Sequence, residues 1–331
     1  MPEPDERAAL ARAAEVLGGA DEVALACHLN PDADALGSML GLSNFLRGRG
    51  VATVCSFANE PFDLPRWLTY LPGADHLVPP AAFPTSPAVM ITCDCASFDR
   101  LGVLGAAASN AHELIWIDHH RSNDGFGTIR LVDPDASSTC EMVFRLIDAM
   151  GGGLDADVAV CLYAGLVTDT GRFQYQATTP ETLRIAARLR EHDFDHAALV
   201  RAMYEDNDPG FLRLLGTALG RMAEVPGASV VWTYLTQADL AEAGVAPGDT
   251  DDVIDVLRTA RDVDVAAVLK QQRDGRFKVS VRSRGGHDLS AVASAFGGGG
   301  HRLAAGYTSE HGPEGTIERL VAALRQVPVT S

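Results

Sequence analysis

The segment "EVALACHLNPDADALGS", residues Glu22–Ser38, is the most informative part of the sequence for the fold class. Its apolar run Val23–Cys27 predicts a buried strand, and the pattern of small and apolar residues over Ala35–Arg47 predicts a helix. Three side chains that can ligate a metal ion stand between them, namely His28, Asp32 and Asp34. Such a cluster at a strand-to-helix junction predicts a ligand site at the carboxyl end of a strand.

The rest of the first half repeats this alternation of short apolar runs and helical patterns. We expect further strands at 51–57, 88–93 and 113–117, an amphipathic helix near the N-terminus, and helices at 139–150 and 156–167. Buried strands that alternate with helices favour a parallel sheet with helices on both faces.

The second half has a different pattern. We expect helices at 179–191 and 195–205, a strand at 228–235, a helix near 249–260 and a hairpin at 263–283 with its turn at Asp274-Gly275. The predicted fold class is therefore α/β, with a parallel-sheet domain at 1–190, a helical linker at 191–220 and a smaller α/β domain at 221–331. We expect the active site in the cleft between the two domains.

Composition limits the classes of partner. The chain has 331 residues and a formal net charge of −17, which excludes the broad basic surface that binding to duplex DNA requires. No apolar run reaches about 18 residues, so we expect no membrane span. The N-terminus lacks the apolar core of a signal peptide, and the six cysteines form no CxxC pair, which favours the reducing cytoplasm.

Acidic or imidazole side chains follow three more apolar runs. They are Asp94 in "VMITCDCAS", Asp118, His119 and His120 in "ELIWIDHH", and Asp169 in "AGLVTDTGRF". A parallel sheet brings strand ends to one edge, so we expect one pocket that holds His28, Asp32, Asp34, Asp94, His119 and Asp169. The residues alone leave open whether His119 or His120 is the ligand.

Crowded carboxylates repel one another, and divalent cations remove that cost. Carboxylates with a minority of imidazoles favour Mn²⁺ or Mg²⁺. We expect two such ions with Asp94, alone at the tip of its strand, as the bridge, and a bridging hydroxide as the nucleophile. The structural alternatives are that Asp32 or Asp34 only caps a helix, that Asp94 is a loop acid, and that Asp169 belongs to a turn.

A local group of basic and glycine residues appears late in the chain. "VRSRGGH" contains Arg282 and Ser283, and "GGGGH" contains Gly299, Gly300 and His301. Glycine lets backbone approach a ligand closely, and its amides can bind a phosphate. In a chain of charge −17, these residues mark a place for an anion.

The four motifs "HLNPDADALGS", "CDCAS", "IDHH" and "GLVTDTGRF" resemble those of the DHH phosphoesterase superfamily, in the same order. "SVRS" and "GGGGHRLAAG" resemble the DHH-associated C-terminal domain, and the chain is most similar to the NrnA-like group. The resemblance implies one metal on His28, Asp32 and Asp94, and a second on Asp34, Asp94, His119 and Asp169.

The resemblance also implies roles for residues around the metals. It implies that His120 faces the scissile phosphate, that Asp118 orients the histidine pair and that Asn123 lies near the phosphates. Thr139 matches a family position but is equally a helix cap, with Ser138 as the competitor. Arg282, Ser283, Gly299, Gly300 and His301 would contact the far end of the substrate.

The implied function is hydrolysis of short nucleotides to mononucleotides. The implied substrates are short oligoribonucleotides, linear or cyclic dinucleotides such as pApA and c-di-AMP, and 3′-phosphoadenosine 5′-phosphate. The implied ions are two divalent cations, Mn²⁺ before Mg²⁺, in a cytoplasmic homodimer. The alternatives are a DHH-type inorganic pyrophosphatase, a RecJ-like exonuclease and a non-catalytic nucleotide sensor.

Overall fold

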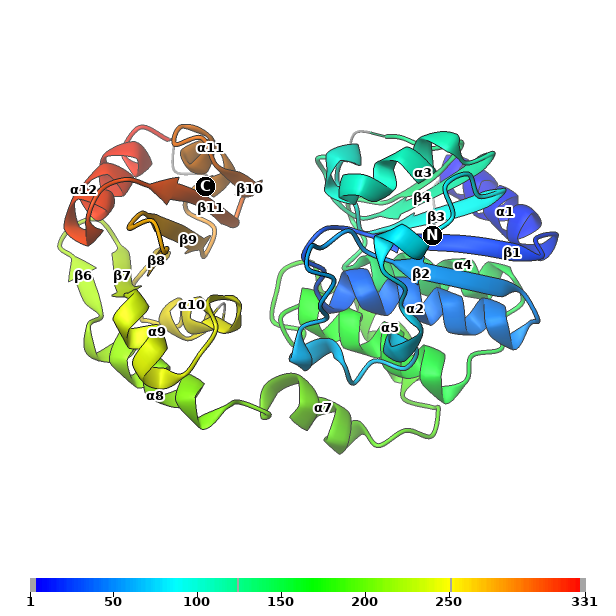
Figure 1. The fold of residues 1–331 in the computed structure, drawn as a ribbon, viewed down its shortest axis with the longest axis horizontal. Helices are drawn as coiled ribbons and strands as arrows, with labels where there is room; N and C mark the ends of the chain where they lie inside the picture. The colour runs from blue at the N-terminus through cyan, green and yellow to red at the C-terminus, as the bar shows by residue number, and fades with distance from the viewer. Residues whose placement is uncertain (1–3, 124, 251, 328–331) are drawn as a thin grey trace. The chain divides into compact units, whose positions relative to one another are not determined.

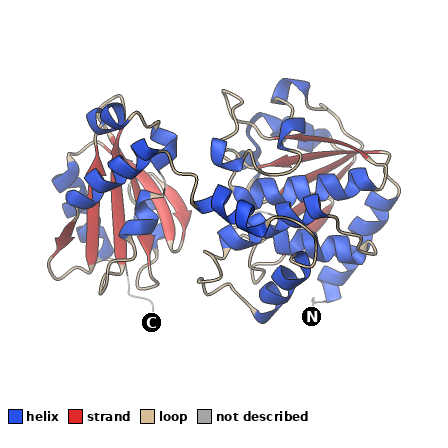
Figure 2. Cartoon of the chain, turned by 90° about the horizontal axis from the view of Figure 1, so that it is seen from below, coloured by secondary structure: helices blue, strands red, loops and turns tan. Residues whose placement is uncertain are grey.

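The computed structural model describes residues 4–123, 125–250 and 252–327. The chain forms two compact units, Met1–Asp206 and Asn207–Ser331 (Figure 1). Among the described residues, no helix combines the length and apolar character needed to cross a bilayer. The predicted α/β fold class is confirmed, because each unit is built on one sheet covered by helices (Figure 2).

The first unit contains a five-stranded sheet in the order β2-β1-β3-β4-β5, and every pairing is parallel. Its strands are β1 Glu22–Cys27, β2 Ala52–Ser56, β3 Val89–Cys93, β4 Glu113–Asp118 and β5 Ile129–Val132. The chain places β2 on one side of β1 and β3 on the other, so the topology switches direction between β1 and β3. Ligands of open α/β sheets bind at such a point, beyond the carboxyl ends of the strands.

The register sets the level of the site. Cys27 pairs with Cys93, and Cys93 pairs with Ile117, so β1, β3 and β4 end in one row. The residues directly beyond that row are His28, Asp94 and Asp118. The register of the three strands therefore places their polar end residues at the same edge of the sheet.

Helices cover both faces of this sheet. The helices of the first unit are α1 Pro4–Gly18, α2 Ala33–Gly48, α3 Gly105–Asn110, α4 Thr139–Ala149, α5 Ala156–Asp169, α6 Pro180–Leu189 and α7 His196–Tyr204, with short 3₁₀ helices η1 Arg66–Leu68, η2 Ala74–His76, η3 Pro80–Ala82 and η4 Phe98–Leu104. The main core packs α1, α2, α4 and α5 on one face, and a smaller core packs η4 and α3 on the other.

Glycine allows α2 and α5 to approach closely. A Cβ at Gly165 in α5 would stand 2.8 Å from the Cα of Asp34 in α2. The absence of a side chain there lets the start of α2, which carries Asp34, lie near the end of α5, which carries Asp169.

The second unit contains a six-stranded sheet in the order β10-β11-β9-β8-β7-β6, in which only β7 and β8 pair in parallel. Its strands are β6 Ala223–Val225, β7 Val230–Leu235, β8 Val265–Gln271, β9 Phe277–Ser283, β10 Gly299–His301 and β11 Ala304–Ser309. Its helices are α8 Pro209–Gly220, α9 Gln237–Ala243, η5 Pro247–Thr250, α10 Val253–Leu257, α11 Leu289–Ser294 and α12 Pro313–Leu324. One face packs against α11 and α12, and the other against α8, α9 and α10.

The predicted hairpin is present as β8 and β9, and Gly275 supplies the left-handed turn residue with φ +87°. Residues 191–220, the predicted helical linker, contain helices of different units. Helix α7 lies in the first unit, whereas α8 packs into a core of the second through Phe211, Leu214 and Ala218.

Candidate metal centre

Asp94 stands directly after β3, with 3% of its surface exposed. Its backbone adopts a left-handed conformation, φ +58°, which is costly for a residue with a Cβ and concentrates at functional sites. This conformation aims its carboxylate into a group of histidines. Oδ2 lies 3.4 Å from Nε2 of His28, and Oδ1 lies 3.7 Å from Nε2 of His119. The two oxygens of one carboxylate therefore face two different imidazoles.

One ligand group consists of His28, Asp32 and Asp94, whose donor atoms lie within 4.8 Å of one another. Asp32 is also the N-cap of α2, because its Oδ1 accepts from the backbone N–H groups of Asp34 and Ala35, both at 3.0 Å. Its Oδ2 lies 3.9 Å from Nε2 of His28. Helix capping and metal ligation use different oxygens, so the two interpretations of Asp32 do not exclude each other.

A second group consists of Asp34, His119 and Asp169. Nε2 of His119 lies 3.4 Å from Asp169 Oδ2 and 3.9 Å from Asp34 Oδ2. The buried Asp34 carboxylate accepts from the backbone N–H groups of Thr139, at 2.7 Å, and Cys140, at 2.9 Å. The N-terminus of α4 thus holds a carboxylate that its partial positive charge stabilises.

Among the described residues a third group overlaps these two, namely Asp94, His119 and His120. Nδ1 of His119 faces the carbonyl oxygen of Ala136 at 3.4 Å, which turns its Nε2 toward the carboxylates. Nδ1 of His120 is instead engaged by Asp118 Oδ1 at 2.7 Å. The structure thus presents His119, rather than His120, to Asp34 and Asp169.

The electrostatics are those of a cation site. Burial and the neighbouring Asp94 raise the pKa of Asp34 to about 7. Burial and the Asp34 carboxylate raise the pKa of Asp169 well above its ordinary value. Burial also acts to raise the pKa of Asp94, but the hydrogen bond from His28 and the nearby imidazoles outweigh it and lower that pKa. Asp34 and Asp169 therefore hold protons more readily than ordinary carboxyl groups, and a divalent cation can replace those protons.

Asp118 and Asn123 form a layer behind His120. Asp118 is fully buried, and its Oδ2 accepts from the amide of Asn123 at 2.6 Å. The same amide donates to the carbonyl of Cys95 at 3.3 Å, and Asn123 Oδ1 accepts from the N–H of Gly125 at 2.7 Å. The polar atoms of Asn123 are thus engaged by the protein itself.

Sequence reasoning missed two contacts of the ligand groups. The hydroxyl of Thr139 donates to Asp94 Oδ1 at 2.8 Å, while the cap of α4 is Ser138, which accepts from Glu141. The guanidinium of Arg100 lies 2.9 Å from Nδ1 of His28, which also faces the Leu29 carbonyl. The resemblance flagged Thr139 without its partner, and no sequence pattern points to Arg100.

The predicted substrate contacts of the second unit lie on adjoining strands. Register places Arg282 of β9, Ala304 of β11 and His301 of β10 in one row. The side chain of His301 lies outside the described part of the chain. Gly300 has φ +139°, and a Cβ there would stand 2.6 Å from Cα of Ala305, so only glycine fits.

Beside this row, the Ser283 hydroxyl donates to Asp264 at 3.1 Å and accepts from the N–H of Gly285. The Arg282 guanidinium donates to the carbonyl of Val281 at 3.1 Å, and Gly299 pairs with Gly306 in the strand ladder. Ser283 therefore braces the loop that follows β9.

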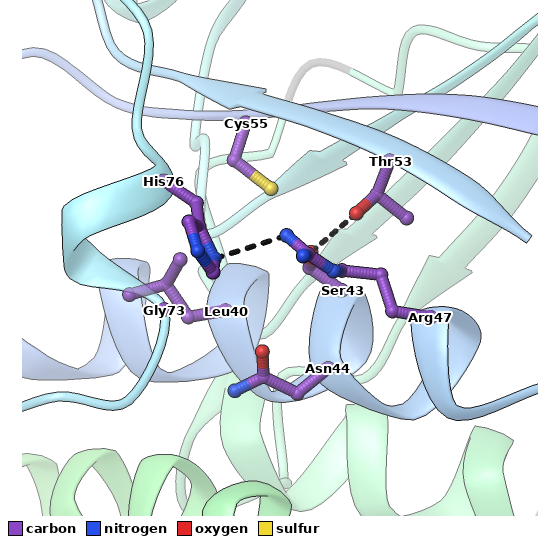
Figure 3. Close-up of a pocket in the computed structure, with 8 residues that line it drawn as sticks. All are labelled: Leu40, Ser43, Asn44, Arg47, Thr53, Cys55, Gly73 and His76. Atoms are coloured by element: carbon purple, nitrogen blue, oxygen red, sulfur yellow. Dashed lines mark hydrogen bonds between the residues drawn. The ribbon is translucent and has the colours of Figure 1, made fainter.

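A pocket between α2, β2 and η2 is separate from this centre (Figure 3). Nη1 of Arg47 lies 3.0 Å from Nδ1 of His76, and the hydroxyls of Ser43 and Thr53 are 2.8 Å apart. Its volume of about 10 Å³ holds no more than a water molecule. None of the predicted site residues lines it.

Two family models match the chain. The model described as "DHH family, N-terminal domain" matches residues 22–166, and the model described as "DHHA1 domain" matches residues 227–328. Both matches fall within the units described above.

Two relatives and one solved structure are similar to the chain. It is 34% identical to a "Bifunctional oligoribonuclease and PAP phosphatase NrnA" of Thermus thermophilus, over 98% of this chain and 96% of the relative. It is 26% identical to a "Cyclic-di-AMP phosphodiesterase GdpP" of Geobacillus thermodenitrificans, over 87% of this chain and 44% of that protein. A solved structure of an exopolyphosphatase-related protein from Bacteroides fragilis superposes with a TM-score of 0.91, at 26% identity, over 97% of this chain and 96% of that one.

Proposed function

The chain belongs to the DHH family and carries a DHHA1 domain, and on that premise we propose that it is a metal-dependent phosphodiesterase and phosphatase of short nucleotides. Its substrates are short oligoribonucleotides, linear or cyclic dinucleotides such as pApA and c-di-AMP, and 3′-phosphoadenosine 5′-phosphate. Near-full-length similarity to an oligoribonuclease and PAP phosphatase, and similarity to a cyclic-di-AMP phosphodiesterase, support this choice.

The observation that carries the proposal is the position of Asp94 between two ligand groups. The donor set, carboxylates with a minority of imidazoles, suits two Mn²⁺ ions, or Mg²⁺, better than a thiolate site. One ion would be held by His28, Asp32 and Asp94, and the other by Asp34, Asp94, His119 and Asp169. When bound, such a pair supplies an activated water and neutralises charge at a phosphate.

His120 is the residue that meets the scissile phosphate in this proposal. Asp118 Oδ1 lies 2.7 Å from its Nδ1 and orients the ring, and in this proposal Nε2 donates to a phosphate oxygen. Burial acts to lower the pKa of His120, but the hydrogen bond to Asp118 outweighs it and raises that pKa, which favours the donating imidazolium. Because the polar atoms of Asn123 are engaged by Asp118, Cys95 and Gly125, we assign it to positioning Asp118.

The second unit supplies the contacts to the remote part of the substrate. Arg282 offers charge to a phosphate, and the backbone at Gly299 and Gly300 permits close approach. The catalytic domain is 1–190 and the substrate-binding domain is 221–331 in this proposal. We further propose a cytoplasmic homodimer. All six cysteines are buried and free, which suits a reducing compartment.

Substrate choice tests the proposal. The protein is incubated with Mn²⁺ and a 5′-labelled RNA dinucleotide, and release of mononucleotide is followed, with phosphoadenosine phosphate and pyrophosphate in parallel. We expect turnover of both nucleotides and its loss in Asp94→Ala, because one carboxylate serves both ions. Rapid pyrophosphate cleavage without nucleotide turnover would show an inorganic pyrophosphatase instead.

A further inference from the structure

A second pocket lies in the second unit, where the end of β11 meets α11 and α12. Its volume is about 290 Å³, near the lower bound of small-molecule sites. The residues that give it its chemistry are Phe296, Tyr307, Glu310, His311, Thr316 and Arg319.

This pocket and the predicted substrate contact Arg282 belong to opposite faces of the sheet. Tyr307 pairs with Val279, and both lie in the core beneath α11 and α12. Successive residues of a strand point to opposite faces, so Ser280 and Arg282 of β9 lie on the other one. The pocket therefore lies on the other face of the sheet from Arg282, the charged residue assigned above to the substrate.

Its aromatic wall carries a polar group without a partner. Phe296 and Tyr307 stack with their ring centroids 4.5 Å apart, at an interplanar angle of 24°. Tyr307 is 6% exposed, and its buried hydroxyl has no hydrogen-bond partner among the described residues. Buried hydroxyls are normally hydrogen-bonded, so an unpaired one beside a cavity calls for an acceptor from outside the chain.

A cation stands beside that wall. Arg319 of α12 is exposed, and its guanidinium lies 6.0 Å from the centroid of the Phe296 ring. Among the described residues Arg319 has no ion pair. Burial raises the pKa of Tyr307, and the nearby charge of Arg319 offsets only part of that increase. Glu310 and His311 add an acceptor and an imidazole at the rim.

We propose that this pocket binds a nucleoside monophosphate or a molecule of the same chemistry, a small aromatic ring system that carries an anionic group and hydrogen-bond donors. The aromatic pair contacts the ring system, Arg319 pairs with the anion, and Tyr307 donates to a ligand acceptor. Glu310 accepts hydrogen bonds from amino or hydroxyl groups of the ligand. Because its carboxylate repels an anion that has no such donors, inorganic phosphate alone should bind less tightly.

The test is titration of the full-length protein with AMP, adenosine and inorganic phosphate by calorimetry, in EDTA so that no cation is held at the first centre. We expect AMP to bind more tightly than either fragment. Arg319→Ala should weaken AMP about tenfold or more and leave adenosine unchanged. Tyr307→Phe, which keeps the ring stack, should weaken AMP about three- to tenfold.

Two matched controls locate the signal. Arg325→Ala removes an exposed arginine at the end of the same helix, and this residue does not line the pocket. Arg282→Ala removes a half-buried arginine on the opposite face of the sheet. Arg325→Ala should bind AMP like the wild type, and Arg282→Ala should keep the binding that depends on Arg319. The inference is overturned if AMP does not bind at millimolar concentration, if Arg319→Ala binds it normally, or if Arg282→Ala abolishes binding. The proposed function is judged by turnover of the RNA dinucleotide in Mn²⁺, which none of these binding titrations measures, so this inference and the proposed function fail separately.

Discussion

Thr139→Val isolates one hydrogen bond to the carboxylate at the centre of the site. Thr139 is fully buried, and its hydroxyl donates to Asp94 Oδ1 at 2.8 Å. Valine keeps the shape and the backbone N–H that binds Asp34, and it removes only this donor. A hydrogen bond to a charged group is worth about 1.5–3 kcal/mol, or roughly 10- to 150-fold in an equilibrium or rate constant.

We expect a loss of roughly 10- to 150-fold in Mn²⁺ affinity or in kcat/KM, since residues that hydrogen-bond to metal ligands have effects of about this size. Calorimetric Mn²⁺ titration and turnover of an RNA dinucleotide measure the two quantities. Thr168→Val is the matched control. Thr168 directly precedes Asp169, but its hydroxyl donates to carbonyl oxygens within α5, those of Ala164 and Gly165. Wild-type affinity and turnover in Thr139→Val would refute the assignment of Asp94, as would an equal loss in the control.

Three further predictions concern neighbouring groups. Asn123→Ala should lower kcat while Mn²⁺ content stays unchanged, because it releases Asp118 from behind His120; loss of metal would contradict this. Asp34, with its pKa at about 7, keeps in the folded apoprotein a proton that the unfolded chain releases near 3.8. The thermal unfolding midpoint in EDTA should therefore decrease as the pH is raised from 4 to 7. Mn²⁺ affinity should increase over the same range, because the bound proton is released more easily. A Mn²⁺ affinity that does not change with pH would refute this linkage. Arg282→Ala should raise KM without changing metal content, and an unchanged KM for every nucleotide would remove it from the substrate face.

The layered α/β fold was predictable because it depends on the alternation of short apolar runs with helical patterns along the sequence. The expected strands at 88–93 and 113–117 correspond within one residue to β3 and β4, since their apolar runs are bounded by polar side chains. Strand β5 was missed because only four residues, Ile129–Val132, form it at the edge of the sheet. Short edge strands carry too few residues for a period to appear.

The candidate site was predictable to the level of strand ends. The shared end row of β1, β3 and β4 fixes where His28, Asp94 and Asp118 stand, and this follows from parallel register. Side-chain partners depend on tertiary packing, which no local pattern encodes. The sequence therefore left open whether Ser138 or Thr139 caps α4.

Arg100 is the clearest case of this limit. It reaches His28 from a 3₁₀ helix on the opposite side of the sheet from α2, 72 residues along the chain. Asp32 shows the converse, since a helix cap and a ligand position fall on one residue. Both interpretations of Asp32, as helix cap and as metal ligand, agree with the structure, and only the tertiary structure shows that one side chain can serve both.

In the proposed site Asp94 lies between two divalent cations. A crystal of the protein grown with Mn²⁺, measured at the manganese absorption edge, tests it directly through anomalous difference density. We expect two peaks about 3.5–4 Å apart, one at His28 and Asp32 and the other at His119 and Asp169, with Asp94 between them. A single peak, or two peaks without Asp94 between them, would rule out a bridging role for Asp94.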